Sequence, residues 1–212
     1  MSKYPIFLEL SSRRVVIVGG GNIALRKAQS LLETGARVVI VADRVQENLI
    51  TLSMENKVEL IKAKYSKNYL VGASLVIAAT NDNHLNERIY KDCQHLETLC
   101  NVVDRPELCD FYVPAVVKRG DLQIAVSTNG KCPAFAGHIR KKLEKIFTDE
   151  SSPFLVELEK IRDEVLNQIE NPSEKKAVLG RLVDDKSFDY FVREGAENWR
   201  RYAEQLIGEN KS

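Results

Sequence analysis

The sequence lacks an excess of charge of either sign, and that absence narrows the classes of partner. Its 212 residues include 31 lysines and arginines against 30 aspartates and glutamates, a formal net charge of +1. A balanced charge points neither to nucleic acid nor to a membrane surface. No apolar run approaches the length of about 20 residues that a transmembrane helix needs. We therefore expect neither nucleic acid nor a membrane as a partner.

Cysteine and histidine are also scarce, and neither occurs in a metal-binding pattern. The sequence has four cysteines without a paired Cys-x-x-Cys spacing, at Cys93, Cys100, Cys109 and Cys132. It has three widely separated histidines, His84, His95 and His138. This pattern predicts free thiols in a reducing compartment and no permanent metal cofactor. The opening residues do not resemble a signal peptide, so we expect a cytoplasmic protein.

What the sequence does contain is a glycine turn between an apolar strand and a helix. Apolar residues 15–18 precede the turn, a helical pattern covers 22–33, and a second apolar run covers 38–41. The Gly-x-Gly-x-x-Ala spacing allows a tight turn and a close approach of backbone to pyrophosphate, which the helix N-terminus then faces. The flanking strand and helix distinguish this motif from a structural tight turn, which remains the alternative. We predict a dinucleotide site formed by Gly19, Gly20, Gly21, Asn22 and Ile23.

The choice between NAD and NADP depends on the end of the second apolar run. An acidic residue usually ends this strand and bonds the ribose hydroxyls. In the commonest spacing that position is Ala42, and Asp43 comes one residue late. Arg44 follows and offers a partner for the 2′-phosphate of NADP. We predict NAD, bound through Asp43, and leave NADP and Arg44 as the alternative.

Apolar runs alternate with helical patterns as far as residue 103. Further strands are expected at 57–61, 74–80 and 98–103, and helices at 46–55 and from 83 to about 95. Such alternation predicts an α/β fold, a Rossmann-type doubly wound parallel sheet that binds ligands beyond the carboxyl ends of its strands. Thr80 and Asn81 follow one strand and are predicted to contact the cofactor, and Asp104 follows the next. The apolar entry at Tyr4–Leu8 is expected to lie against the sheet edge.

The pattern changes near residue 112. Apolar strands at 112–117 and 122–127, joined by Lys118–Asp121, predict a hairpin, and helices follow at 134–147 and from 152 onward. A lone hairpin is poorly stable, so a second subunit is expected to extend it. We predict a Rossmann domain (1–112), a hairpin–helix module for dimerisation and substrate binding (113–149) and a small all-α C-terminal domain (150–212).

A series of short blocks occurs in order along roughly residues 3–147. They are Pro5-Ile6-Phe7, Ala24–Ala28, Gly35-Ala36-Arg37, Ala78–Asp82, Cys100–Asp104, Ala125-Val126-Ser127, and Pro133 ahead of Ile139–Glu144. Together they resemble the precorrin-2 dehydrogenase / sirohydrochlorin ferrochelatase family of sirohaem synthesis. Residues 150–212 match only as a small helical region, so the chain would lack the methyltransferase module to which some relatives are fused.

The resemblance implies an activity. Precorrin-2, a reduced polycarboxylate tetrapyrrole, loses a hydride to NAD⁺ and a proton to give sirohydrochlorin, and some members also insert Fe²⁺ as a substrate. The family is homodimeric, with much of the interface formed by the segment after the Rossmann domain. A homodimer of this kind would explain how a hairpin that is poorly stable alone is extended by a second subunit.

The resemblance also places Asp104 at the position of the family's key aspartate. A carboxylate near the nicotinamide can accept a proton as the hydride leaves, so we predict a general base. The alternative is an N-cap or turn aspartate ahead of Arg105-Pro106. The carboxylates of the substrate need hydrogen-bond donors. We predict that these are Ser127, Thr128, Asn129, Lys131 and Arg105, since a loop rich in donors and an arginine can both bind carboxylates. For any one basic residue, a solvated surface position is the alternative.

Two other functions stay open. One is a nucleotide-sensing regulatory Rossmann module, which would not need Asp104 or a donor-rich loop after the hairpin. The other is a non-catalytic tetrapyrrole carrier. Release of NADH from precorrin-2 and NAD⁺ would separate the enzyme from both.

Overall fold

The computed structural model of the chain describes residues 3–209 and forms two compact units that divide between Val113 and Pro114. The outer limits of the predicted domains, at residues 1 and 212, lie outside the described residues. Each unit is described here by itself. No helix within residues 3–209 is both long and apolar enough to cross a membrane.

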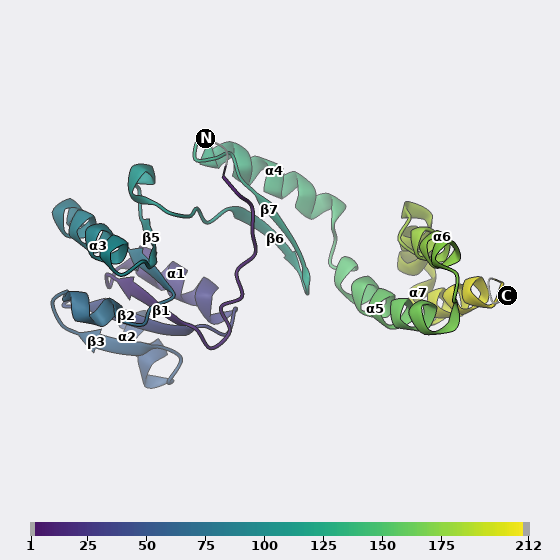
Figure 1. Ribbon diagram of the computed structural model, residues 1–212, viewed down its shortest axis with the longest axis horizontal. Helices are drawn as coiled ribbons and strands as arrows, with labels where there is room; N and C mark the ends of the chain where they lie inside the picture. The colour runs from purple at the N-terminus through teal and green to yellow at the C-terminus, as the bar shows by residue number, and fades with distance from the viewer. Residues whose placement is uncertain (1–2, 210–212) are drawn as a thin grey trace. The chain divides into compact units, whose positions relative to one another are not determined.

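The first unit is built on a five-stranded parallel sheet with the strand order β3-β2-β1-β4-β5 (Figure 1). The strands are β1 (Arg14–Val18), β2 (Arg37–Ala42), β3 (Glu59–Lys62), β4 (Leu75–Ala78) and β5 (Leu99–Val102). Ile17 of β1 pairs with Ile40 on one side and Ile77 on the other. The strand order reverses at β1, and such a reversal is where open α/β sheets bind ligands.

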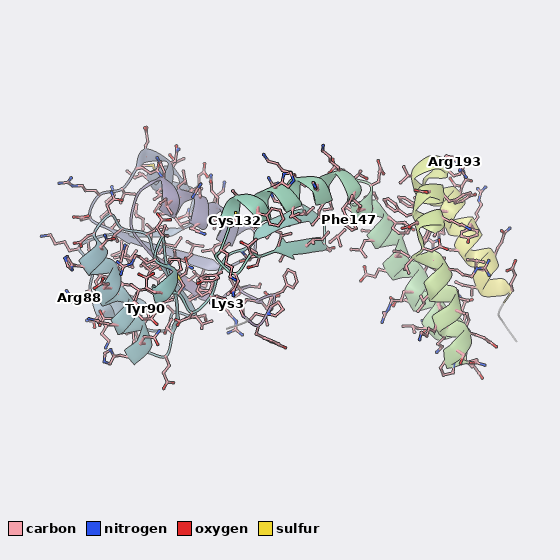
Figure 2. All side chains as sticks on the ribbon, turned by 90° about the horizontal axis from the view of Figure 1, so that it is seen from above. Lys3, Arg88, Tyr90, Cys132, Phe147 and Arg193 are labelled. Atoms are coloured by element: carbon pink, nitrogen blue, oxygen red, sulfur yellow. The ribbon has the colours of Figure 1, made fainter. Side chains whose placement is uncertain are left out.

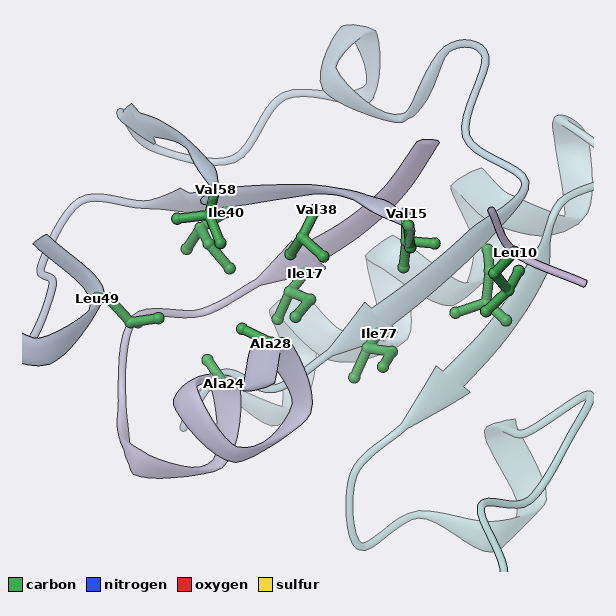
Figure 3. Packing of buried hydrophobic residues seen from close by; sticks show 12 residues of the cluster. Leu10, Val15, Ile17, Ala24, Ala28, Val38, Ile40, Leu49, Val58 and Ile77 are labelled. Atoms are coloured by element: carbon green, nitrogen blue, oxygen red, sulfur yellow. The ribbon is translucent and has the colours of Figure 1, made fainter. Parts of the chain in front are cut away.

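Helices cover both faces of this sheet because each central strand is apolar on both faces. On one face, α1 (Asn22–Leu32) and α2 (Glu47–Met54) bury Ala24, Ala28 and Leu49 against Ile17 and its neighbours (Figure 3). On the other, α3 (Asn83–His95) and the 3-10 helix η1 (Lys67–Leu70) pack on the intervening residues of the same strands. The doubly wound fold predicted from the alternating pattern is confirmed.

The small alanines of α1 bring the glycine turn close to the sheet. Ala24 and Ala28 are both fully buried, and in Figure 3 they face the strand that carries Ile17. The helix ends at Leu32, and Gly35, three residues later, lies at φ +72°, a conformation that favours glycine.

The second unit begins with the antiparallel hairpin β6 (Ala115–Arg119) and β7 (Leu122–Val126), followed by α4 (Pro133–Ile146). The predicted hairpin is confirmed, but Lys118 and Arg119 belong to β6 rather than to the loop, because Arg119 pairs with Leu122. The buried Val117 of β6 and Ala136 of α4 mark the covered part of the hairpin.

The rest of this unit is helical, with α5 (Ser151–Gln168), α6 (Pro172–Leu182) and α7 (Asp185–Gly208). Their core surrounds Trp199, which is fully buried and donates from Nε1 to Ser187 Oγ at 2.8 Å. Gly195, at φ +81°, kinks α7. Residues 185–208 therefore form one helix with a kink at Gly195.

The N-terminal entry differs from its prediction. Tyr4 and Phe7 are 87% and 69% exposed, so the expectation that Tyr4–Leu8 lies against the sheet edge is wrong. Within the described residues the first buried apolar side chain is Leu10. A short apolar run predicts burial, but these side chains stay exposed within residues 3–209.

Candidate functional site

A cavity of about 910 Å³ opens beyond the carboxyl ends of β1, β2, β3 and β4. It adjoins the point where the strand order reverses. Seven residues predicted to contact the cofactor line it, namely Gly19, Gly20, Gly21, Asp43, Arg44, Thr80 and Asn81. Asn22 and Ile23 are not in the lining, and they form the start of α1. The cavity is large enough for a substantial small molecule.

The three glycines of the turn have different steric surroundings. A Cβ on Gly19, which lies at φ +132°, would come closer than 3.0 Å to the carbonyl of Ala79. A Cβ on Gly20 would come equally close to the carbonyl of Arg44, whereas a Cβ on Gly21 would meet nothing within 4 Å. The chain's own backbone therefore requires Gly19 and Gly20, and Gly21 borders open space. The sequence motif allows any residue at position 20, so the need for glycine at this position was not predicted.

The N-terminus of α1 supplies unpaired backbone donors beside this space. Gly21 is the N-cap, and no side chain caps the helix. The first intrahelical bond runs from Leu25 N to Gly21 O at 3.1 Å, so the amides of Asn22 and Ile23 have no helical acceptor. Free amides and the helix dipole together favour an anion at this end.

The packing at the end of β2 explains why the acidic residue, Asp43, comes one position after the usual one. Ala42, the last residue of β2, is buried, and its Cβ would lie 3.0 Å from a Cβ on Gly20. Asp43 and Arg44 follow it and are both exposed in the cavity lining. Neither side chain has a hydrogen bond or ion pair within residues 3–209. Both remain available to a ribose or to a ribose phosphate.

Sequence reasoning missed a second set of lining residues, which come from the end of β3 and from α3. Tyr65 donates from its hydroxyl to Asp92 Oδ2 at 2.8 Å, and the guanidinium of Arg88 lies 5.7 Å from the centroid of its ring. Burial, and then the Asp92 bond, raises the pKa of Tyr65 well above its usual range, so the ring stays neutral. Figure 2 shows Arg88 projecting from α3. The only sequence signal was the position of Tyr65 just beyond a strand.

Gln46 adds an unpaired donor to the same lining. Its backbone N donates to Gly20 O at 3.0 Å, which ties α2 to the glycine turn. Its side-chain Nε2 is buried and has no acceptor within the described residues. A buried donor without an acceptor is costly, so a ligand oxygen in the cavity would stabilise this side chain.

Asp104 comes two residues after the end of β5 and has a strained backbone. Its φ is +60°, a conformation that residues other than glycine adopt at a cost and that is common at functional sites. Its side chain is exposed and has no hydrogen-bond partner in the described chain, and it lies outside the cavity lining. The bond from Val103 N to Ala78 O, at 3.0 Å, connects it to the end of β4.

The loop that carries Asp104 is fastened to the edge of β5. The buried Asn101 donates from Nδ2 to Phe111 O at 2.9 Å, and Cys100 N donates to Asp110 Oδ2 at 2.8 Å. Arg105 pairs with Glu87 at 3.2 Å and with Glu107, and the Glu107 bond raises the pKa of the guanidinium. Two carboxylates thus already hold Arg105, which weakens its predicted role as a substrate donor.

The remaining predicted donors lie in the second unit, in the loop between β7 and α4. Ser127 Oγ accepts from Asn129 N, and Thr128 Oγ1 accepts from Cys132 N, both at 3.1 Å. Because each hydroxyl accepts from the backbone, its hydrogen stays free to be donated. Lys131 is exposed, and Cys132 stands at the start of α4 (Figure 2). The predicted site residues therefore divide between the two units.

Within residues 3–209, no group of three or more His, Cys, Asp or Glu side chains could hold a metal ion. All four cysteines are free: Cys93 and Cys100 are buried, Cys109 is half-buried and Cys132 is exposed.

The fold and the cavity define a Rossmann-type nucleotide-binding protein. Residues 6–115 match the family described as putative NAD(P)-binding, and residues 119–146 match the family described as sirohaem biosynthesis protein, central. The chain belongs to the family described as putative NAD(P)-binding, with a nicotinamide nucleotide site in its first unit, and it resembles the precorrin-2 dehydrogenase / sirohydrochlorin ferrochelatase family. The predicted resemblance is confirmed.

Individual relatives agree with this assignment. The chain is 42% identical over 146 residues to a siroheme synthase of Psychrobacter arcticus, covering 69% of this chain and 27% of that protein. It is 34% identical over 188 residues to a siroheme synthase of Actinobacillus pleuropneumoniae serotype 3, covering 89% and 39%. The chain thus spans well under half the length of these relatives.

A solved structure shares the fold. The structure of "SirC, precorrin-2 dehydrogenase" superposes with a TM-score of 0.79 at 23% identity, covering 98% of this chain and 100% of that chain. The arrangement of a parallel sheet, a hairpin and C-terminal helices is therefore common to both.

Proposed function

We propose that this protein is an NAD-dependent dehydrogenase that oxidises precorrin-2 to sirohydrochlorin in sirohaem biosynthesis. The observation that carries the proposal is the cavity of about 910 Å³ at the glycine turn, in a chain whose relatives are siroheme synthases. An exposed carboxylate, Asp104, follows the neighbouring strand β5. A nucleotide sensor would need the cavity but not this carboxylate.

The dinucleotide would bind along the cavity with its pyrophosphate at the N-terminus of α1. Gly21 leaves the space that the phosphates need, and the free amides of the first turn face them. Gln46 Nε2 is a donor without an acceptor, suited to a phosphate or ribose oxygen. The adenine would lie against Tyr65 and Arg88, since an aromatic ring and a guanidinium both stack on a base.

We infer that the cofactor is NAD rather than NADP. Asp43 is an exposed acceptor in the lining, suited to ribose hydroxyls. A 2′-phosphate would meet its negative charge, although Arg44 stands beside it. When bound, NAD⁺ supplies the hydride acceptor.

Asp104 would act as the general base. A carboxylate oxygen at this position takes the proton that precorrin-2 loses as its hydride leaves. The side chain is exposed, and its backbone, at φ +60°, holds it at the strand end. The same group offers an acceptor for pyrrole protons if the chain also inserts Fe²⁺ as a substrate.

Precorrin-2 carries several carboxylates, and the loop after β7 would bind some of them. Ser127 and Thr128 have hydroxyl hydrogens free to donate, Asn129 adds an amide, and Lys131 adds a positive charge. Arg105 is a weaker candidate because Glu87 and Glu107 compete for it.

The hairpin supports a homodimer in the cytoplasm. A two-stranded sheet is poorly stable alone. Val116 of β6 and Phe135 of α4 are 38% and 56% exposed, and a second copy would bury apolar surface of this kind. Light scattering should give about twice the chain mass of 24.0 kDa, and the mass of one chain would refute the dimer. The free thiols suit a reducing cytoplasm.

The test is to incubate the chain with precorrin-2 and NAD⁺ without oxygen, and to record NADH and the tetrapyrrole spectrum. We expect NADH and sirohydrochlorin in equal amounts, with a slower reaction when NADP⁺ replaces NAD⁺. Asp104→Asn should bind NAD⁺ normally but lose turnover by at least about a hundredfold. A later addition of Fe²⁺ tests metal insertion against the spontaneous rate.

The outcomes separate the candidate functions. Absence of NADH with the wild-type chain would refute the dehydrogenase. Binding of NAD⁺ alone would then favour a nucleotide sensor, and binding of the tetrapyrrole alone would favour a carrier. Unchanged turnover by Asp104→Asn would remove this residue from the mechanism.

A further inference from the structure

Asn86 is a buried polar residue on a helix face that is otherwise apolar. It lies in the first turns of α3 and is 2% exposed, and Ile89 and Cys93 further along α3 are fully buried in the core. An amide buried at such a position destabilises the fold unless it is hydrogen-bonded. The bonds that Asn86 makes therefore indicate what the side chain does.

All of these bonds go to Thr80, in the loop after β4. Asn86 Oδ1 accepts from Thr80 Oγ1 at 2.7 Å and from Thr80 N at 3.4 Å. Asn86 Nδ2 donates to Thr80 O at 3.0 Å. A single side chain thus engages the amide, the carbonyl and the hydroxyl of Thr80.

The consequence is that Thr80 presents its polar groups to the protein rather than to the cavity. Asp82 is fixed as well, because its carboxylate caps α3 by accepting from His84 N at 2.9 Å and Leu85 N at 3.1 Å. Asn81 lies between these two fixed residues. Its side chain is exposed and belongs to the cavity lining.

The same loop borders the glycine turn. The carbonyl of Ala79, just before Thr80, occupies the space that a Cβ on Gly19 would need. A shift of the Thr80 backbone would therefore change the distance between the turn and Asn81. Both of these groups face the cavity.

We propose that Asn86 is a positioning residue for dinucleotide binding, which holds the β4–α3 loop so that Asn81, and not Thr80, contacts the dinucleotide. This inference rests on the proposed function, since it needs a dinucleotide in the cavity. A purely structural Asn86 would stabilise the fold and leave affinity unchanged.

The experiment measures the Kd for NAD⁺ by calorimetry on the full chain, well below the melting temperature of each variant. Asn86→Asp keeps the shape of the side chain but replaces the donor to Thr80 O with an oxygen. Asn83→Asp is the matched control, because it adds the same charge at an exposed position at the start of α3. We expect Asn86→Asp to raise the Kd about tenfold and Asn83→Asp to leave it within about twofold.

A double-mutant cycle then tests whether Asn86 acts through Asn81. Asn81→Ala alone should raise the Kd about tenfold, and the double variant should be little worse than either single variant, because both lose the same contact. Where Asn86→Asp does not fold, Thr80→Val replaces it in the cycle, since it removes the hydroxyl bonded to Asn86 at 2.7 Å.

Three results would overturn the inference. One is a Kd unchanged by Asn86→Asp, another is a Kd unchanged by Asn81→Ala, and the third is a double variant about a hundredfold weaker than wild type, the product of two independent effects. If the wild-type chain does not bind NAD⁺, the proposed function fails and this inference fails with it. If the wild-type chain binds NAD⁺ and the variants bind it with the same Kd, this inference fails and the proposed function stands.

Discussion

Substitution of neighbouring glycines should separate the folding of the turn from its affinity for a dinucleotide. Gly20 and Gly21 are adjacent, but only the first is surrounded by the chain's own atoms. We predict that Gly20→Ala lowers stability, and that Gly21→Ala leaves stability nearly unchanged and weakens NAD⁺ binding.

The effect at Gly20 follows from steric overlap. A methyl group there would come well within 3.0 Å of the carbonyl oxygen of Arg44, so the two backbone segments must separate by more than an ångström to reach an ordinary contact of 3.4 Å. The bond from Gln46 N to Gly20 O, at 3.0 Å, joins the same two segments and would be strained. Overpacking costs about 1–3 kcal/mol and a weakened hydrogen bond about 1 kcal/mol, so we expect a loss of roughly 2–4 kcal/mol. The Tm should fall by about 10 °C.

The effect at Gly21 is different because its backbone conformation suits any L-residue. Its φ is −94°, and an added Cβ meets nothing within 4 Å. Alanine restricts the unfolded chain, which stabilises by about 0.4–1 kcal/mol, and this gain is offset by a similar loss because alanine is a poor N-cap. The methyl group would, however, occupy the space where pyrophosphate approaches. We expect the Kd for NAD⁺ to rise at least about tenfold.

Thermal unfolding and calorimetric titration with NAD⁺ measure the two effects on the same samples. An unchanged Tm in Gly20→Ala would refute the steric argument. Wild-type affinity in Gly21→Ala, with the fold intact, would show that no phosphate approaches at this position.

Three further predictions concern the thiols, the pH dependence and the cofactor. Cys132 should react with a thiol reagent within mixing time, whereas Cys93 and Cys100 should react only on unfolding, and early loss of three or more thiols would contradict the buried assignments. A hydrogen bond between the free thiols of Cys93 and Cys100, and then burial, raise the pKa of Cys100 far above its usual 9.0. The neutral thiol therefore stabilises the fold fully below pH 9, and the free energy of unfolding falls as the pH rises above 9, by up to about 1.4 kcal/mol per pH unit. Denaturant titrations should show this decline in the wild type and a weaker one in Cys100→Ala, and parallel curves would refute it. Asp43→Ala should raise the Kd for NAD⁺ about tenfold and Arg44→Ala should not, and the reverse result would favour NADP.

The sequence predicted the elements well where local patterns decide them. The run Val15–Val18 is apolar throughout, as a parallel strand covered on both faces requires, and the structure has a buried strand there. Exposure of Tyr4–Leu8 was not predictable, because apolar composition shows a need for burial but not whether the chain supplies a surface.

Only some of the residues that line the cavity could be predicted from the sequence, for a related reason. Gly19 and Gly21 belong to a motif whose spacing encodes the contact, so they were found from sequence. Tyr65 and Arg88 are 23 residues apart, and both line the cavity, where Asp92 on α3 accepts a bond from the Tyr65 hydroxyl. Asn86 lies between Leu85 and Glu87 in an ordinary helical pattern, and only its burial distinguishes it. Tertiary contacts of this kind leave no local signal.

The position of the acidic residue shows how such a contact shapes the site. By the usual spacing the residue after Val41 should be acidic, but this position lies beneath the glycine turn, where the Cβ of Ala42 would already be 3.0 Å from a Cβ on Gly20. A carboxylate there would be buried against backbone, and burial of an unpaired charge is costly. Asp43, one residue later, is exposed and lines the same cavity. The shift of the acidic residue is therefore consistent with dinucleotide binding, because the tight packing of Gly20 requires a small residue at position 42 and leaves the next position free for the carboxylate.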